Sequence, residues 1–266
     1  MTVSAELLDA PSVDLALAAP VEQILARCDE IHDEDKKAER RKKIVMFGGI
    51  ALLVPLVIIL TLIFDNPFVM FVALILGFGG GALVYSKVGA ADVEDRKLEV
   101  VQSLLTQLGP ELRRNRPVKV DVDFSAYTHS GGSHQWLKLE MALMDGTGVR
   151  VQGVTSYKRK TRAKRKYTKI KDKVRDRLIV TLAPPKGHVF NTTAKLATGA
   201  QIGGMQVRRW NLKPKAARVE FETGVMMRIR GRQGWTGVGL ERSLDGRMVL
   251  AGIMASYRMV AASNRG

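Results

Sequence analysis

Two long apolar segments, residues 44–64 and 68–85, constrain this chain more than any other feature. Neither contains a Lys, Arg, Asp or Glu, and only three residues separate them. A helix rises about 1.5 Å per residue, so each segment is long enough to cross the roughly 30 Å hydrocarbon core of a bilayer. The sequence therefore predicts a membrane protein with a two-helix transmembrane hairpin at residues 44–88. The alternative is a helical hairpin buried in the core of a large globular domain. It is disfavoured, because two adjacent charge-free segments of this length are rare in such domains.

Positive charge flanks the predicted hairpin at both of its ends but not at its tip. The cations before it are Lys36, Lys37, Arg40, Arg41, Lys42 and Lys43, and those after it are Lys87, Arg96 and Lys97. Because positive residues beside membrane spans stay in the cytoplasm, we expect both termini to be cytoplasmic and the protein to be integral to the cytoplasmic (inner) membrane. The single cysteine, Cys28, agrees with a reducing compartment.

Small residues within the hairpin predict close packing of helices. Gly48 and Gly49 lie in the first segment, and Gly77 and Gly81 lie in the second at the four-residue spacing that lets helix backbones approach. Packing within one hairpin is the favoured interpretation, and a homo-oligomer with a glycine seam is the alternative. The absence of ionisable residues from both segments argues against an ion pathway through a single copy.

The residues on either side of the hairpin have helical periodicity. Apolar residues recur at helical spacing in residues 19–43 and again in residues 89–110. These segments predict two amphipathic helices that form a cytoplasmic stalk, with two membrane-surface helices as the alternative. Residues 1–18 show no clear period and are expected to be flexible.

Residues 111–266 carry the positive charge of the chain. Residues 1–110 hold 10 of the 42 Lys and Arg but 15 of the 26 Asp and Glu, so the net charge of +16 arises entirely from the C-terminal part. Apolar residues alternate with polar ones in residues 118–124 and 137–143, which is the period of a strand with one buried face. We therefore predict a basic α+β domain, mainly of antiparallel strands, that is large enough to form its own core.

Two details of this domain are predicted from local patterns. Val219 and Phe221 are expected to pair with Ile229 and Met227 in a hairpin around Gly224, with Glu220 opposite Arg228 across the two strands. Residues 244–260 have the composition of either a helix or a last strand, and helix is favoured.

The densest charge lies in residues 158–177, where only Asp172 and Asp176 oppose the cations. Such a block repels itself and is expected to project as a long loop or an extended hairpin that binds an anionic partner. The candidate polyanion-binding residues are Lys158, Arg159, Lys160, Arg162, Lys164, Arg165, Lys166, Lys169, Lys171 and Lys173.

Three kinds of partner fit this charge. Anionic lipid headgroups rank first for a domain held at a membrane. Nucleic acid and an acidic protein follow, although only Tyr157 and Tyr167 could stack on bases and no RNA-recognition or helix-turn-helix signature is present. A solvated basic loop without a partner is the remaining interpretation.

The sequence offers little for catalysis. His129 and His134 bracket a Ser-Gly-Gly-Ser turn, but no cysteine or carboxylate cluster of metal-ligand spacing accompanies them, so an ordinary turn is favoured. No Ser, Cys or Lys has an identifiable activating neighbour. We therefore predict a non-enzyme without metal or cofactor: a membrane-anchored scaffold or tether whose basic domain contacts anionic lipid or another polyanion. The alternatives are a membrane tether for nucleic acid and a subunit that binds an acidic protein.

Overall fold

The computed structural model describes residues 14–64, 93–124, 132–164, 167–193, 196–231, 234–238 and 243–263. The chain divides into two compact units. The helical unit comprises residues 1–13 and 29–93, and the sheet unit comprises residues 14–28 and 94–266. All the described strands belong to the sheet unit.

Helix α1 (Val21–Phe64) is one helix of 44 residues. It contains the first predicted span, residues 44–64, together with the charged residues that precede it. Of the helices that the structure describes, none is both long enough and apolar enough to cross a membrane. The predicted transmembrane hairpin is therefore wrong, and with it the inner-membrane location and the cytoplasmic assignment of the termini. The first apolar segment is the C-terminal part of this longer helix, whose N-terminal part is rich in charged residues.

The helix packing expected at Gly48, Gly49, Gly77 and Gly81 stays a prediction. Gly48 and Gly49 both lie in this helix, and a Cβ atom added to Gly48 would meet no neighbouring atom within 4 Å. No described part of the chain therefore packs closely against Gly48. Gly77 and Gly81 lie, with the whole second apolar segment, outside the described residues.

The sheet unit is built on an antiparallel sheet with strand order β1-β2-β3-β4-β5-β8-β7-β6, in which β9 also pairs with β5 and β10 pairs with β9. The strands are β1 (Asp14–Ala19), β2 (Val118–Asp123), β3 (Gly132–Ala142), β4 (Gly148–Lys164), β5 (Tyr167–Ala183), β6 (Gln201–Ile202), β7 (Met205–Lys213), β8 (Ala216–Glu222), β9 (Met226–Gly231) and β10 (Gly234–Val238). The alternating segments 118–124 and 137–143 thus supply β2 and much of β3, and the expected antiparallel arrangement is present.

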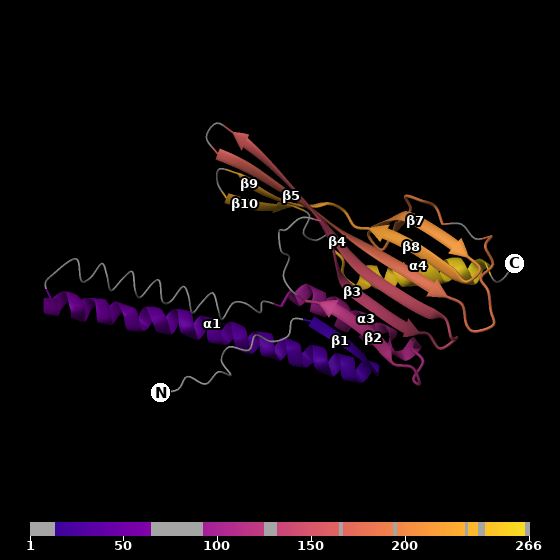
Figure 1. Cartoon of the computed structure of the whole chain (residues 1–266), viewed down its shortest axis with the longest axis horizontal. Helices are drawn as coiled ribbons and strands as arrows, with labels where there is room; N and C mark the ends of the chain where they lie inside the picture. Colours follow the sequence, from indigo (N-terminus) through magenta and orange to yellow (C-terminus); the bar gives the residue numbers. More distant parts are fainter. Residues whose placement is uncertain are drawn as a thin grey trace. The chain divides into compact units, whose positions relative to one another are not determined.

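Two helices of the sheet unit, α3 (Asp95–Leu108) and α4 (Gly246–Ser263), contact each other along one face of the sheet (Figure 1). A short 3-10 turn, η2 (Gly109–Glu111), follows α3. α3 buries an apolar stripe that includes Leu98, Val101, Leu104 and Leu108. α4 covers most of residues 244–260, so the favoured prediction of a helix there is confirmed. We call the face of the sheet that carries these helices the inner face and the opposite face the outer face.

The predicted hairpin between residues 219–221 and 227–229 is wrong. β8 and β9 do not pair with each other: β8 pairs with residues 177–182 of β5, and β9 pairs with residues 170–174 of the same strand. Glu220 faces Ile179 in this register, and Arg228 faces Asp172. The reason is the length of β5, whose 17 residues provide edge for two successive partners.

β4 and β5 form a hairpin that extends beyond the helix-covered part of the sheet (Figure 1). β3 pairs with β4 only as far as Tyr157, and β8 pairs with β5 only as far as Arg177. We call residues 158–164 of β4 and 167–177 of β5 the arm. β9, which itself pairs with β10, borders β5 along part of this length.

Candidate functional site

The arm places its cations on one face. β4 and β5 pair without a register shift over their full length, so side chains alternate strictly between the two faces. On β4 the buried residues Val149, Val151 and Tyr157 fix odd numbers to the inner face, and on β5 the buried residues Leu178 and Val180 fix even numbers there. Every outward position from residue 158 to 162 and from 169 to 177 is Lys or Arg. We call this set the basic face: Lys158, Lys160, Arg162, Lys169, Lys171, Lys173, Arg175 and Arg177.

Like charges stand directly opposite each other on the basic face. The backbone register pairs Lys158 with Lys173, Lys160 with Lys171, and Arg162 with Lys169. Like charges in directly opposed positions destabilise an antiparallel pair. Three successive pairs of this kind form a ladder of repulsion along the arm.

Few acids offset this charge. Within the part of the chain that the structure describes, Arg175 is the one member of the basic face with an ion pair: its Nη1 lies 3.2 Å from Oε1 of Glu222. Nearer the base of the sheet the outer face is balanced instead. Arg150 pairs with Glu140 at 2.9 Å and Arg218 pairs with Glu220 at 3.0 Å. In the described structure, these outer-face cations near the base are thus ion-paired, whereas Arg175 alone is ion-paired on the basic face.

Asp172, one of the two acids of the arm, lies on the inner face. It is fully buried, and its carboxylate accepts two hydrogen bonds from Arg159, at 2.9 Å from Nε and 3.0 Å from Nη2. This paired geometry raises the pKa of Arg159 above its ordinary value. The guanidinium also lies 5.8 Å from the centre of the Tyr157 ring. Burial, and then the nearby Asp172 carboxylate, raises the pKa of Tyr157.

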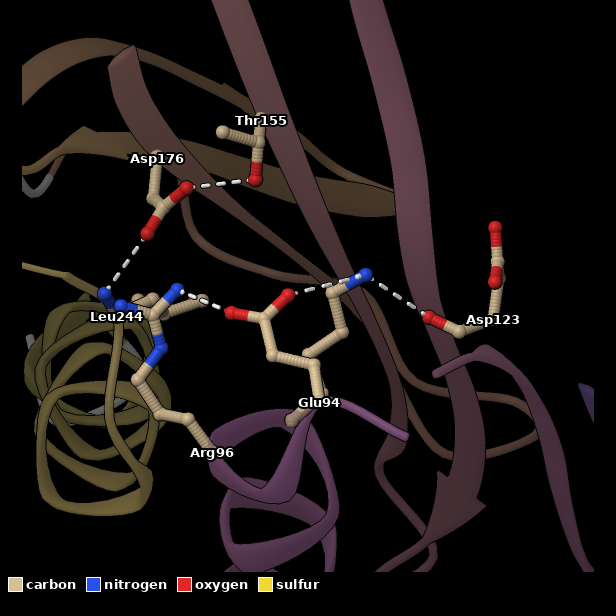
Figure 2. A network of polar contacts seen from close by, with 7 residues as sticks. Glu94, Arg96, Asp123, Thr155, Asp176 and Leu244 are labelled. Atoms are coloured by element: carbon tan, nitrogen blue, oxygen red, sulfur yellow. Dashed lines mark hydrogen bonds and ion pairs between the residues drawn. The ribbon is translucent and has the colours of Figure 1, made fainter. Parts of the chain in front are cut away.

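Asp176, the second acid, joins four parts of the sheet unit. Its carboxylate accepts a hydrogen bond of 2.6 Å from the Thr155 hydroxyl and one of 2.9 Å from the backbone N–H of Leu244, just before α4 (Figure 2). Its own N–H donates to the Thr223 hydroxyl at 3.1 Å, after the end of β8. Both acids of the arm are thus used on the inner face, and the basic face keeps no acid of its own.

The structure separates the ten predicted binding residues. Six of them lie on the basic face, whereas Arg159 lies on the inner face with Asp172. Lys164 is the last residue of β4, and Arg165 and Lys166 lie outside the described residues. The ten do not include Arg175 and Arg177, which the alternation that begins at Lys169 also places on the basic face. The six on the basic face are Lys158, Lys160, Arg162, Lys169, Lys171 and Lys173.

A second polar network holds α3 against the sheet. Lys97 is only 3% exposed; its Nζ donates to the carbonyl oxygen of Asp123 at 3.2 Å and lies 3.6 Å from Oε2 of Glu94. The ammonium also lies 5.7 Å from the ring of Trp136. Burial lowers the pKa of Lys97. The sequence interpretation treated this lysine as a cation flanking a membrane span, but its contacts make it a packing residue.

The structure describes only one of the two histidines that bracket the Ser-Gly-Gly-Ser segment. His134 Nε2 lies 2.7 Å from Oδ2 of Asp123, and His129 falls outside the described residues. Across the residues that the structure describes, no group of three or more His, Cys, Asp or Glu side chains is arranged to hold a metal ion.

A small pocket of about 260 Å³ lies between the β3–β4 turn and α4. Asp145 lines it and accepts hydrogen bonds from the Tyr257 hydroxyl at 2.6 Å and from the N–H and hydroxyl of Thr147, each at 2.8 Å. Burial alone would raise the pKa of Asp145, but these hydrogen bonds outweigh it and hold the pKa below the ordinary 3.8. The hydrogen bond to Asp145, followed by burial, raises the pKa of Tyr257. The carboxylate is already occupied by protein donors, so it joins α4 to the turn.

Replacing Tyr257 by Phe should lower the free energy of unfolding by about 1 kcal/mol near pH 7, because a hydrogen bond to a charged group is lost. The folded pKa of Asp145 is depressed, so this contribution is present above 3.8 and disappears as the pH falls through the folded value. The difference between wild type and variant, measured by denaturant unfolding, should therefore vanish in acid. A difference that stays constant down to the acid limit would contradict this assignment.

Comparisons of the chain with protein-family models, with curated proteins and with solved structures find no match. A role for the basic face therefore has to follow from its own charge and geometry.

Proposed function

We propose that this protein binds a polyanion through the basic face of its arm. The observation that carries the proposal is the ladder of like charges: Lys158 opposite Lys173, Lys160 opposite Lys171, and Arg162 opposite Lys169. A hairpin that only needed solubility gains nothing from placing cations in directly opposed positions, since each such pair costs stability. An anionic polymer lying across the two strands neutralises both members of every pair at once.

The inner face explains how the arm tolerates this repulsion. The ion pair between Arg159 and Asp172 and the bond between Thr155 and Asp176 both join β4 to β5 on the side away from the basic face. These inner-face interactions stabilise the pairing of β4 with β5. The outer face can therefore carry cations in opposed positions. The expected contact with anionic lipid relied on the transmembrane hairpin and loses that support.

The test uses a variant whose charges change sign on β4 alone. Lys158→Glu, Lys160→Glu and Arg162→Glu together place a carboxylate opposite each of the three lysines of β5, so the arm should be more stable by about 0.2–1 kcal/mol per pair. Loss of binding by this variant cannot then be attributed to unfolding. We expect its affinity for heparin, used as a general polyanion, to fall at least tenfold in the full-length chain.

The matched control reverses three exposed lysines elsewhere in the sheet unit: Lys186→Glu, Lys213→Glu and Lys215→Glu. It changes the net charge by the same amount, and at physiological salt charges more than about 8 Å away are largely screened. Its heparin affinity should remain within about threefold of wild type. Equal losses in the two variants would show that net charge, not the basic face, governs binding and would overturn the proposal.

A further inference from the structure

We infer that the polyanion bound by the basic face is a double-stranded nucleic acid, contacted through its phosphate backbone without preference for sequence. This inference depends on the proposed function and names the class of its partner. It follows from which residue types occupy the outward positions of the arm and from how they are spaced.

The basic face lacks what a protein partner requires. The centre of a protein–protein interface is rich in aromatic residues and poor in Lys. Here all eight outward positions are cationic, and the five lysines among them are Lys158, Lys160, Lys169, Lys171 and Lys173. These eight positions provide no apolar centre for a protein interface. They suit a polymer that carries negative charge along its whole length.

The basic face also lacks what a single-stranded partner requires. Proteins that hold single strands add aromatic platforms on which the unpaired bases stack. Tyr157, the aromatic residue at the base of the arm, points to the inner face, where it is buried beside Arg159. None of the eight positions of the basic face is aromatic, and Tyr167, the first residue of β5, precedes those on that strand. These eight positions therefore offer contacts to phosphate, and such contacts carry no sequence information directly.

The spacing of the cations fits a duplex. Outward residues recur about every 6.7 Å along a strand, and the two strands lie about 4.8 Å apart, so the row from Lys169 to Arg177 extends about 27 Å. A duplex presents about one negative charge per 1.7 Å of axis and offers more phosphates over that length than the eight cations can neutralise. Several cations can therefore reach phosphates at the same time.

The number of contacts gives a measurable salt dependence. Each neutralised phosphate contributes about −0.9 to the slope of log Kobs against log[salt], so eight contacts set a limit of about −7. Reversing the three β4 charges should make the slope shallower by about 3. The control with Lys186, Lys213 and Lys215 reversed should keep the wild-type slope.

The experiment measures fluorescence anisotropy of labelled DNA duplexes of about two helical turns, in two unrelated sequences, with the full-length chain between about 50 and 200 mM salt. We expect the two sequences to bind equally within about threefold, with a slope between about −5 and −7. An RNA duplex of the same length tests whether the form of the helix matters, and binding to either duplex supports the inference.

Three outcomes would overturn the inference. They are tighter binding of a single strand than of its duplex, tighter binding of phosphatidylserine vesicles or polyglutamate at equal charge, and failure to bind any duplex. If heparin still binds in those cases, the inference fails while the proposed function stands. If neither heparin nor duplex binds, both fail.

Discussion

Replacing Asp176 by Ala should lower the free energy of unfolding by about 3–5 kcal/mol, the largest effect expected for a polar residue of this chain. The carboxylate accepts from the Thr155 hydroxyl and from the N–H of Leu244, and all three residues are buried. Removing it leaves these two buried donors with neither a protein acceptor nor water to bind. Each such unsatisfied donor lowers the free energy of unfolding by about 1–3 kcal/mol. The link from β4 and β5 to the start of α4 is lost at the same time.

Two further variants separate this explanation from a general effect of losing a negative charge. Asp176→Asn keeps one acceptor oxygen and should cost about half as much as Asp176→Ala. Asp121 is exposed on the outer face of β2, and its replacement by Ala should change stability by less than about 0.5 kcal/mol. Chemical denaturation of the three variants gives the comparison, and a cost for Asp176→Ala below that of Asp121→Ala would refute the assigned role.

Gly252→Ala should destabilise the protein by about 1–3 kcal/mol, because α4 lies too close to the sheet for a side chain at this position. A Cβ atom there would lie 2.6 Å from Cδ2 of Leu178 and 3.3 Å from Cε2 of Phe221. Both of those residues are fully buried, so neither can move aside without disturbing the core. The gain of about 1 kcal/mol in helix propensity offsets only part of this cost.

Gly48→Ala is the matched control, since Gly48 is also helical but has open space around its Cα. It should raise stability by up to about 1 kcal/mol. Combining Gly252→Ala with Leu178→Val should cost less than the two changes do separately, because the smaller side chain relieves the clash. Additive costs in thermal unfolding would show that the two positions do not press against each other.

The sequence predicted local strand periodicity well. Alternation of apolar and polar residues identified the strands at residues 118–124 and 137–143, and the same alternation in the arm separates the cations from Asp172 and Asp176. The same alternation, applied to every residue of the arm, places Arg159 on the inner face and Arg175 and Arg177 on the outer face. The placement of charge on the two faces was therefore available from the order of residues alone.

The errors concern relations that local patterns do not determine. The turn near Gly224 looks like a hairpin because its flanking residues alternate, yet β8 and β9 both find their partner in β5, which is far away in the sequence. Lys97 was interpreted as a cation flanking a membrane span, but it is buried, beside Trp136 and a carbonyl of β2. The transmembrane prediction relied on two apolar segments considered in isolation from the charged helix that the first of them continues.

The electrostatic design of the arm is asymmetric. Its inner face contains two buried carboxylates with well-placed donors, and its outer face contains cations opposed to cations. The first arrangement stabilises the hairpin and the second destabilises it. We propose that a bound polyanion removes the second effect, so binding and ordering of the arm should be coupled.

Hydrogen exchange of the backbone amides in residues 158–162 and 169–173 tests this account most directly, in the full-length chain with and without heparin. For the wild type we expect heparin to slow exchange in these residues and to leave the buried strands β2 and β3 unchanged. In the variant with Lys158, Lys160 and Arg162 changed to Glu, we expect slower exchange before heparin is added and no further change afterwards. Arm amides that exchange at the same rate with and without heparin in the wild type, under conditions where heparin is bound, would contradict the central claim.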